Sequence, residues 1–233
     1  MKNISQPRYF FTEMEMGNAF QEKLLSPAGL PGIGRFDGIF REITCGQGIP
    51  DFIALKTYGS LKQLGLSRNW GPLDSFIISL LSPFAPRTLS HIVKKSSFSV
   101  ESTRRSLYHL EKSGCIEKTG KGSYLLRQEL ENKHIEIWAF ELKLDNPKRA
   151  VFQAQQYRAF AQRAIIVAPP SQIKNYDRFE QALARWGIGL TSFDPMTGVF
   201  HLVRRSRKGK PLSKQQHIYA MSQMLVSKNV TWT

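Results

Sequence analysis

The sequence predicts an α/β protein whose mixed sheet is flanked by helices and interrupted by an inserted helical unit. Short apolar runs alternate with amphipathic helical patterns before residue 56 and again after residue 130, which is typical of layered α/β folds. The stretch between them has a different pattern, with helices followed by a basic hairpin. The chain has 233 residues, 41% of them hydrophobic, which is enough for a sizeable core.

The first segment, residues 1–68, predicts a helix followed by a hairpin. Thr12 is a suitable N-cap for the helix, and Glu15 completes a capping box with it. Gly46-Gln47-Gly48 predicts the turn between the two strands. The predicted elements are a helix over 12–25 and strands over 36–44 and 49–55.

The middle segment, residues 69–129, predicts three helices and a hairpin. Ser99 is a good N-cap for the third helix, and Gly114 a good stop. The apolar face of that helix is predicted to contain Val100, Leu107 and Leu110. The predicted elements are helices over 72–81, 88–95 and 99–113 and two short strands within 115–128.

This order of elements resembles a winged helix-turn-helix domain. The resemblance implies that the third helix and the hairpin, or wing, approach DNA. The residues implied to contact DNA are Ser102, Arg104, Arg105, Tyr108, Lys118 and Lys121. Winged helices also serve as protein-binding modules, so a protein partner is the alternative.

After residue 130 the alternation of strands and helices resumes in two further segments, 130–205 and 206–233. The predicted elements are strands over 135–144, 164–168, 188–193 and 199–203, and helices over 148–163, 171–186 and 212–226. The basic stretch 204–210 is either a clamp on a nucleic-acid backbone or a disordered basic tail.

The chain is strongly basic, with a formal charge of +15 and a pI of about 10.0. Residues 70–128 contain nine Lys and Arg against four Asp and Glu, a balance of +5. Residues 204–233 contain seven basic and no acidic residues, which leaves only +3 for the rest of the chain. Such an uneven excess favours a polyanionic partner, nucleic acid first and an acidic membrane second.

Cysteine usage and hydropathy indicate a cytoplasmic protein. Cys45 and Cys115 have no second cysteine or histidine at zinc spacing, so we expect no zinc site. Lone thiols fit a reducing compartment. The first residues lack the apolar stretch of a signal peptide, and no segment has the length of a membrane-spanning helix, so we expect no membrane association.

Two short segments place charged residues on otherwise apolar strands. In the first, Asp51 follows Pro50, and in the second, Glu141 and Lys143 lie two positions apart. Residues two apart on a strand share a face, and an isolated buried carboxylate is costly unless it is compensated. Two carboxylates and a lysine on neighbouring strands are suited to a hard divalent cation and a water nucleophile.

This pair of motifs resembles the PD-(D/E)xK, or restriction-endonuclease-like, nuclease superfamily, with Pro50-Asp51 as the first half and Glu141-Leu142-Lys143 as the second. The resemblance implies that Asp51, Glu141 and the Leu142 backbone carbonyl bind Mg²⁺ or Mn²⁺. It implies that Lys143 orients or helps deprotonate the attacking water and offsets charge on the phosphate. Glu-x-Lys alone is a common pattern. Taken without the first motif, Glu141 and Lys143 would be interpreted as an exposed ion pair on a half-solvated sheet.

The helix after the second motif carries Gln153 and Tyr157, at positions i and i+4. This Gln-x-x-x-Tyr spacing is similar to a motif in the branch of the superfamily that includes recombination exonucleases. The two side chains share one helical face and could meet a phosphate or the surroundings of Lys143. A polar helix surface is the alternative.

Many members of the superfamily also carry a glutamate on the first helix, and Glu22 is the preferred match. Several other acids remain open: Glu13 and Glu15 on the same helix, Glu42, and Asp37. Glu42 could bind a second ion or pair with Arg41. The sequence does not decide among these acids.

The motifs together predict a metal-dependent DNA endonuclease in which a restriction-endonuclease-like core is interrupted by a winged helix that positions duplex DNA. Two alternatives stay open. One is a non-catalytic DNA-binding regulator or scaffold on a nuclease fold, and the other is a nuclease for RNA or structured DNA junctions. Double-strand cutting needs two active sites, so a homodimer or a partner subunit is an associated expectation.

Overall fold

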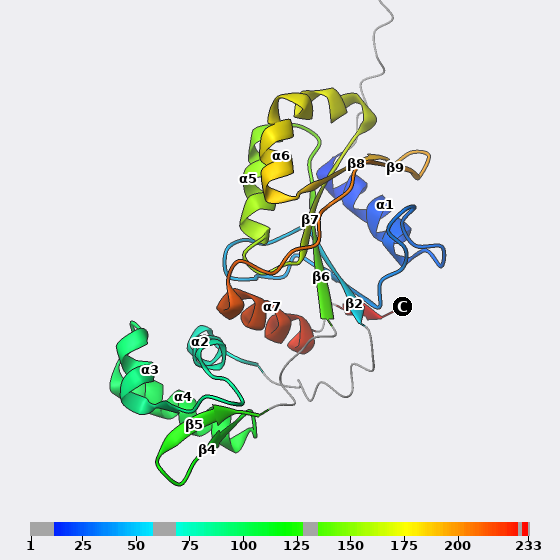
Figure 1. The fold of residues 1–233 in the computed structure, drawn as a ribbon. Coiled ribbons are helices and arrows are strands. Elements are labelled where there is room, and N and C mark those ends of the chain that lie inside the picture. The colour runs from blue at the N-terminus through cyan, green and yellow to red at the C-terminus, as the bar shows by residue number, and fades with distance from the viewer. Residues whose placement is uncertain (1–11, 58–68, 128–134, 228–229, 233) are drawn as a thin grey trace, which may run out of the picture.

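The computed structural model describes residues 12–57, 69–127, 135–227 and 230–232 (Figure 1). It shows a mixed α/β architecture in which a seven-stranded sheet is flanked by helices. A smaller three-stranded sheet belongs to the inserted segment, residues 69–127. The predicted fold class, a mixed sheet flanked by helices, is therefore confirmed at this level.

The large sheet is antiparallel at both edges and parallel in its centre. Its order is β10-β1-β2-β6-β7-β8-β9, and β6, β7 and β8 run parallel. The strands are β1 (Gly38–Arg41), β2 (Phe52–Thr57), β6 (Ile135–Leu142), β7 (Arg163–Ala168), β8 (Gly189–Asp194), β9 (Val199–Arg204) and β10 (Val230–Trp232). Helical crossovers connect the parallel strands, as this geometry requires.

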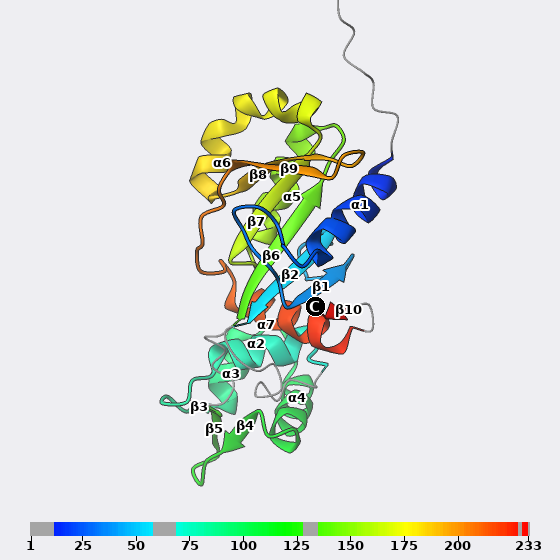
Figure 2. The same cartoon turned by 90° about the vertical axis from the view of Figure 1, so that its right-hand side faces the viewer.

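Helices cover both faces of the sheet (Figures 1 and 2). Helix α1 (Glu13–Leu25) lies on one face, where Met16, Phe20 and Leu24 pack against apolar residues of the sheet. The opposite face is covered by α5 (Pro147–Tyr157), the 3₁₀ helix η3 (Pro170–Phe179), α6 (Glu180–Trp186) and α7 (Lys214–Val226). The sheet thus has two separate cores, one on each face.

The inserted segment has the order helix, strand, helix, helix, strand, strand. Its elements are α2 (Pro72–Leu80), β3 (Arg87–Thr88), α3 (Leu89–Lys95), α4 (Val100–Lys112), β4 (Ile116–Lys118) and β5 (Ser123–Leu126). Helix α2 packs against α7, and the Trp70 backbone amide donates a hydrogen bond of 2.6 Å to the Ser222 hydroxyl. The insertion is therefore anchored on a helix that lies late in the chain.

Local signals predicted several elements correctly. The Thr12 side chain accepts from the Glu15 amide while the Glu15 carboxylate accepts from the Thr12 amide, so the capping box is confirmed. Ser99 caps α4 as predicted. All eight residues of β6 are buried, including its two glutamates. The helix expected over 212–226 is α7.

Two predicted helices differ from the structure. The helix expected over 148–163 ends at Tyr157, and the Arg158 guanidinium then donates to the carbonyls of Ala161 and Gln162. The helix expected over 171–186 is instead η3 followed by α6. The inward-facing residues of η3 are Ile173, Tyr176 and Phe179. A spacing of three keeps these side chains on one face only at three residues per turn, which explains the 3₁₀ form.

Other sequence predictions need correction. The first strand ends at Arg41 rather than residue 44, because Glu42 has a φ of 53° and turns the chain. Val100 is exposed in the first turn of α4, and the buried face consists of Thr103, Ser106, Leu107 and Leu110. The sequence did not indicate β3 or β10.

The basic stretch 204–210 packs against the body of the protein, which argues against a disordered tail there. The Arg207 amide donates to the Gly187 carbonyl and the Gly209 amide to the Gln162 carbonyl. Lys208 forms an ion pair of 2.6 Å with Glu136. In the described ranges, no helix combines the length and apolar character needed to cross a bilayer.

Candidate active site

Asp51 and Glu141 are brought together by strand pairing. Strands β2 and β6 are antiparallel, with Phe52 opposite Phe140, so the next position places Asp51 opposite Glu141. The Asp51 carboxylate accepts a hydrogen bond of 2.6 Å from the Leu142 backbone amide. The predicted juxtaposition of the two acidic motifs is thus present in the structure.

Glu141 is a buried carboxylate with too few hydrogen-bond and ion-pair partners to offset the cost of burying its charge. It is 1% exposed, and its partners are the Tyr157 hydroxyl, which donates to Oε2, and the Lys143 ammonium, 3.4 Å from Oε1. Burial, followed by repulsion from Asp51, raises the Glu141 pKa to about 7 despite these two partners. Burial likewise raises the pKa of Asp51.

Lys143 sits among carboxylates. Its Nζ lies 3.3 Å from Glu13 Oε1 and 3.4 Å from Glu141 Oε1. Burial alone would lower the pKa of Lys143, but the charges of Glu141, Glu13 and Asp51 outweigh burial and raise it. Lys143 is therefore protonated at neutral pH and acts as a donor and positive charge, because an ammonium cannot accept a proton.

The structure brings Glu13, rather than Glu22, to this lysine. Glu13 is the first residue of α1 and reaches Lys143 from the end of that helix, whereas Glu22 is exposed further along α1. Glu15 is held in the helix cap. Of the acids left open by the sequence, Glu13 is therefore the one paired with Lys143.

Glu42 and Asp37 occupy different surroundings. Glu42 borders a cleft beside Asp51 but is largely exposed, and it forms an ion pair of 3.6 Å with Arg41. The Asp37 carboxylate accepts hydrogen bonds from the amide and hydroxyl of Thr57, which gives it a structural role in the hairpin.

Tyr157 and Gln153 lie against the carboxylates from α5. The Tyr157 hydroxyl is 3.3 Å from the Ile49 carbonyl as well as bonded to Glu141. Its ring packs so closely on Gly48 that a Cβ there would lie 3.0 Å from the ring. Gln153 interacts with the Tyr157 hydroxyl, and its Oε1 is buried without a partner among the described residues. The Gln-x-x-x-Tyr pair thus faces the site rather than solvent.

A cleft of about 220 Å³ opens beside Asp51. Glu13, Gly17, Arg41 and Phe52 contribute to its walls. Arg41 donates a hydrogen bond of 2.7 Å to Asn18 and lies over the Phe52 ring, 5.6 Å from its centroid. This cation at the cleft was not a sequence candidate, because its place depends on the packing of α1 against β1.

Tyr176 is a second residue that sequence analysis missed. It is buried in η3, and burial together with the charges of Glu141 and Asp145 raises its pKa. Its phenol therefore stays neutral and lies close enough to the carboxylates to be influenced by them. The period-three apolar pattern of η3 is the signal that could have placed it facing the sheet.

The residues present fit a lightly held divalent cation. Among the described residues no group of three His, Cys, Asp or Glu side chains gathers around a common point, so this site offers a cation at most the two carboxylates of Asp51 and Glu141. Mg²⁺ commonly uses one or two carboxylates and keeps several waters. The raised pKa values of Asp51 and Glu141 and the unpartnered Gln153 Oε1 are consistent with a cation and its waters.

The residues implied to contact DNA lie in the insertion, away from the site formed by Asp51 and Glu141 (Figure 2). Arg104, Lys118 and Lys121 are exposed. Ser102 is half-buried and bonded to Ser99. Arg105 forms a weak, exposed ion pair with Glu101 at 3.9 Å, and the exposed Tyr108 ring lies 5.6 Å from the Lys112 ammonium.

Comparisons of the chain with protein-family models, with curated proteins and with solved structures found no match. What the site can do therefore has to follow from its own residues and geometry.

Proposed function

We propose that the protein is a metal-dependent endonuclease that hydrolyses phosphodiester bonds of DNA. The observation that carries the proposal is the pairing of Asp51 with Glu141 across β2 and β6, with Lys143 on the same strand run. A buried pair of carboxylates is unfavourable unless a cation shares the site. Asp51, Glu141 and the Leu142 carbonyl would hold Mg²⁺ or Mn²⁺.

A bound Mg²⁺ would lower the pKa of a water ligand and offset negative charge on the phosphate. Lys143, held protonated by its three carboxylate neighbours, donates hydrogen bonds to the attacking water or to a phosphate oxygen. Glu13 is half-exposed at 3.3 Å from Lys143 Nζ, where its carboxylate can take the proton released by the water. The Tyr157 hydroxyl fixes the orientation of Glu141.

The insertion supports duplex DNA as the substrate. Its order of helices and strands is similar to that expected of a winged helix-turn-helix domain, and it carries a net charge of +5 over residues 70–128. The start of β6 lies near the insertion and its far end carries Glu141 (Figure 2). The eight residues of β6 span about 26 Å at roughly 3.3 Å each, so a duplex that contacts both the insertion and Glu141 would have to extend along this strand.

A non-catalytic scaffold remains the second candidate, because one surface of the insertion suits a protein partner. A groove of about 480 Å³ between α2 and α4 includes Phe98 and Tyr108, which are 44% and 61% exposed. Exposed aromatic side chains around a groove are typical of protein interfaces. In this alternative, the insertion binds duplex DNA or a protein partner, and the site at Asp51 and Glu141 hydrolyses no phosphodiester bond.

The test is cleavage of supercoiled plasmid with Mg²⁺, with Mn²⁺ and with EDTA, comparing the native chain with Glu141→Gln and Asp51→Asn. We expect metal-dependent nicking or linearisation that falls at least a thousandfold in both variants, while duplex binding in EDTA stays within a few-fold. Circular dichroism checks the fold of each variant. Binding without cleavage in the native chain would favour the scaffold.

Parallel substrates sharpen this experiment. Single-stranded RNA and a four-way DNA junction replace the plasmid under the same metal conditions. Cleavage of only one of these would assign that substrate instead of duplex DNA. Linear product formed without accumulation of nicked circles would indicate two cooperating sites, and light scattering would show whether a homodimer provides them.

A further inference from the structure

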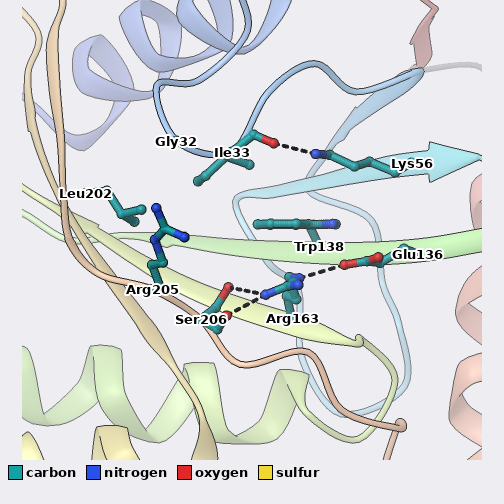
Figure 3. A pocket seen from close by; sticks show the side chains of 9 residues that line it. All are labelled: Gly32, Ile33, Lys56, Glu136, Trp138, Arg163, Leu202, Arg205 and Ser206. Atoms are coloured by element: carbon teal, nitrogen blue, oxygen red, sulfur yellow. Dashed lines mark hydrogen bonds and ion pairs between the residues drawn. The ribbon is translucent and has the colours of Figure 1, made fainter.

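A second pocket lies at the start of β6, the opposite end of the strand from Glu141 (Figure 3). Its volume is about 230 Å³. It is formed by the loop after α1 at Gly32 and Ile33, by Lys56 of β2, by β6 and β7, and by Leu202, Arg205 and Ser206 around the end of β9. Side chains alternate along a strand, so Glu136 and Trp138 face away from the side of Glu141. The pocket is therefore separate from the candidate active site.

Positive charge exceeds negative charge in this pocket. Its acidic residue, Glu136, is already paired with Arg163 and Lys208, both at 2.6 Å. Lys56 donates to the Ile33 carbonyl, and Arg205 extends into the pocket from the end of β9 (Figure 3). Neither Lys56 nor Arg205 forms an ion pair with a carboxylate in the part of the chain that the structure describes.

The indole of Trp138 organises the cations. Its ring is seen edge-on between Lys56 and Arg163 in Figure 3, with the Lys56 Nζ 5.1 Å and the Arg163 Cζ 4.6 Å from the ring centroid. The Trp138 side chain is buried, with 6% of its surface exposed, and its Nε1 has no hydrogen-bond partner among the described residues. A buried donor with no acceptor is uncommon and indicates a missing partner such as a water or a ligand.

Lys56 is a partly buried cation. Burial lowers its pKa, and this outweighs the charge of Glu136, which raises the pKa more than the charge of Arg163 lowers it. An anion placed beside Lys56 would compensate this burial. The pocket contains the ammonium of Lys56 from β2 and the guanidinium of Arg205 from the residue after β9, and such groups bind phosphoryl oxygens in proteins.

We propose that this pocket binds a phosphoryl group carried by a nucleotide or by a nucleic-acid strand, with Arg205 and Lys56 as its main contacts. The volume of about 230 Å³ is larger than a phosphate alone requires and leaves room for an attached sugar. Because the pocket lies at the opposite end of β6 and contains neither Asp51 nor Glu141, we expect binding there without a divalent cation.

The first experiment is isothermal titration calorimetry of the full chain in EDTA with inorganic phosphate, thymidine monophosphate, and a short oligonucleotide with or without a 5′-phosphate. The variants are Arg205→Ala and, as a matched control, Arg204→Ala. Arg204 is adjacent and has the same charge, but it pairs with Glu180 instead of lining the pocket. Arg205 is exposed, so its removal leaves the core intact.

We expect saturable binding by the native chain and at least a tenfold rise in Kd for Arg205→Ala, with less than a twofold change for Arg204→Ala. Tighter binding of the mononucleotide than of the oligonucleotides would identify a free nucleotide as the ligand. A preference for the 5′-phosphorylated oligonucleotide would identify a strand end. Equal weakening in both arginine variants, or no saturable binding, would overturn the proposal.

A site-specific readout complements calorimetry. The indole N–H resonance of Trp138, assigned by its loss in Trp138→Phe, should shift on addition of inorganic phosphate in the native chain and in Arg204→Ala. The shift should need at least tenfold more phosphate in Arg205→Ala. If the chemical shift of the Trp138 indole N–H does not change at saturating phosphate, the ligand does not bind in this pocket. Neither measurement depends on cleavage, so failure of the nuclease proposal leaves this test intact.

Discussion

Strand β6 carries two buried glutamates that the protein treats in opposite ways. Glu136, 3% exposed, pairs with two cations, Arg163 and Lys208. Glu141, 1% exposed, has one lysine, which it shares with Glu13, and it faces a second carboxylate, Asp51. The first glutamate sits where positive charge is in excess, and the second where negative charge is in excess.

The difference shows how one strand can serve two kinds of ligand. A buried charge with matched partners holds structure together, because all of its interactions are satisfied within the chain. A buried charge with too few partners is stabilised only when a ligand of opposite sign arrives. The end of β6 therefore suits a cation, and its start suits an anion.

The largest expected effect concerns Lys143, the lysine that pairs with Glu141 at the end of β6 where negative charge is in excess. Replacing it in Lys143→Met should lower the cleavage rate by about a hundred- to ten-thousandfold, because a charge-assisted donor to water or phosphate is lost. The control is Lys148→Met, an exposed lysine at the start of α5. Initial rates on plasmid check the prediction, and equal rates in both variants would remove Lys143 from the mechanism.

The next effect compares the two glutamates directly. Glu136→Gln leaves Arg163 and Lys208 without their shared carboxylate and should lower the free energy of unfolding by about 3 kcal/mol. Glu141→Gln should cost much less at pH 7.5 in EDTA, because it removes a charge that repels Asp51. Urea unfolding of both variants measures the difference, and a greater loss for Glu141→Gln would reverse the comparison.

Stability should also depend on pH through Glu141. Its pKa is about 7 in the folded protein against an ordinary value of 4.5, so the folded state holds a proton that the unfolded state has released between these values. Stability in EDTA should therefore fall as pH rises from about 4.5 to about 7, by an amount on the order of 2 to 3 kcal/mol. The raised pKa of Asp51 acts in the same direction.

The pH effect has a built-in control. Glu141→Gln cannot titrate at this position, so its unfolding free energy should change less between pH 5 and pH 7.5 than that of the native chain. Denaturation midpoints at the two pH values make the comparison. Parallel pH profiles for the two proteins would show that Glu141 keeps an ordinary pKa.

The smallest effect decides which acid of α1 belongs to the site. Glu13→Gln should reduce cleavage about tenfold, since this carboxylate lies 3.3 Å from Lys143 Nζ. Glu22→Gln changes the same chemistry at an exposed position of the same helix and should stay within twofold. The ratio of the two rates is the measurement, and the reverse order would restore Glu22 as the better match.

Sequence analysis predicted best where the signal is local. The capping box of Thr12 and Glu15, the cap of α4 at Ser99 and the apolar run of β6 each contain their own determinants, and all three are confirmed. The meeting of Asp51 with Glu141 was expected from the family resemblance, because spacing alone does not pair β2 with β6 across the inserted segment. Boundaries were missed where tertiary contacts decide, as at Tyr157 and at η3.

The second pocket was beyond the reach of sequence analysis. Its walls come from five separate stretches of the chain. Lys56 stands in no local motif, and the basic stretch 204–210 did not indicate that Arg205 would line a pocket. Even the choice between Glu13 and Glu22 depended on the angle at which α1 crosses the sheet. Sequence spacing fixes which residues share a face, but long-range packing decides which faces meet.

The edge pairing of β10 with β1 has a consequence for synthesis of the chain. The register joins Gly38 to Trp232, nearly the whole length of the described chain apart, and α7 next to β10 also anchors the insertion through Ser222. Because translation proceeds from the N-terminus, β1 stays an open edge and the insertion lacks its dock until this late region emerges. The edge of β1 that pairs with β10 therefore stays unpaired until the last described strand has been synthesised.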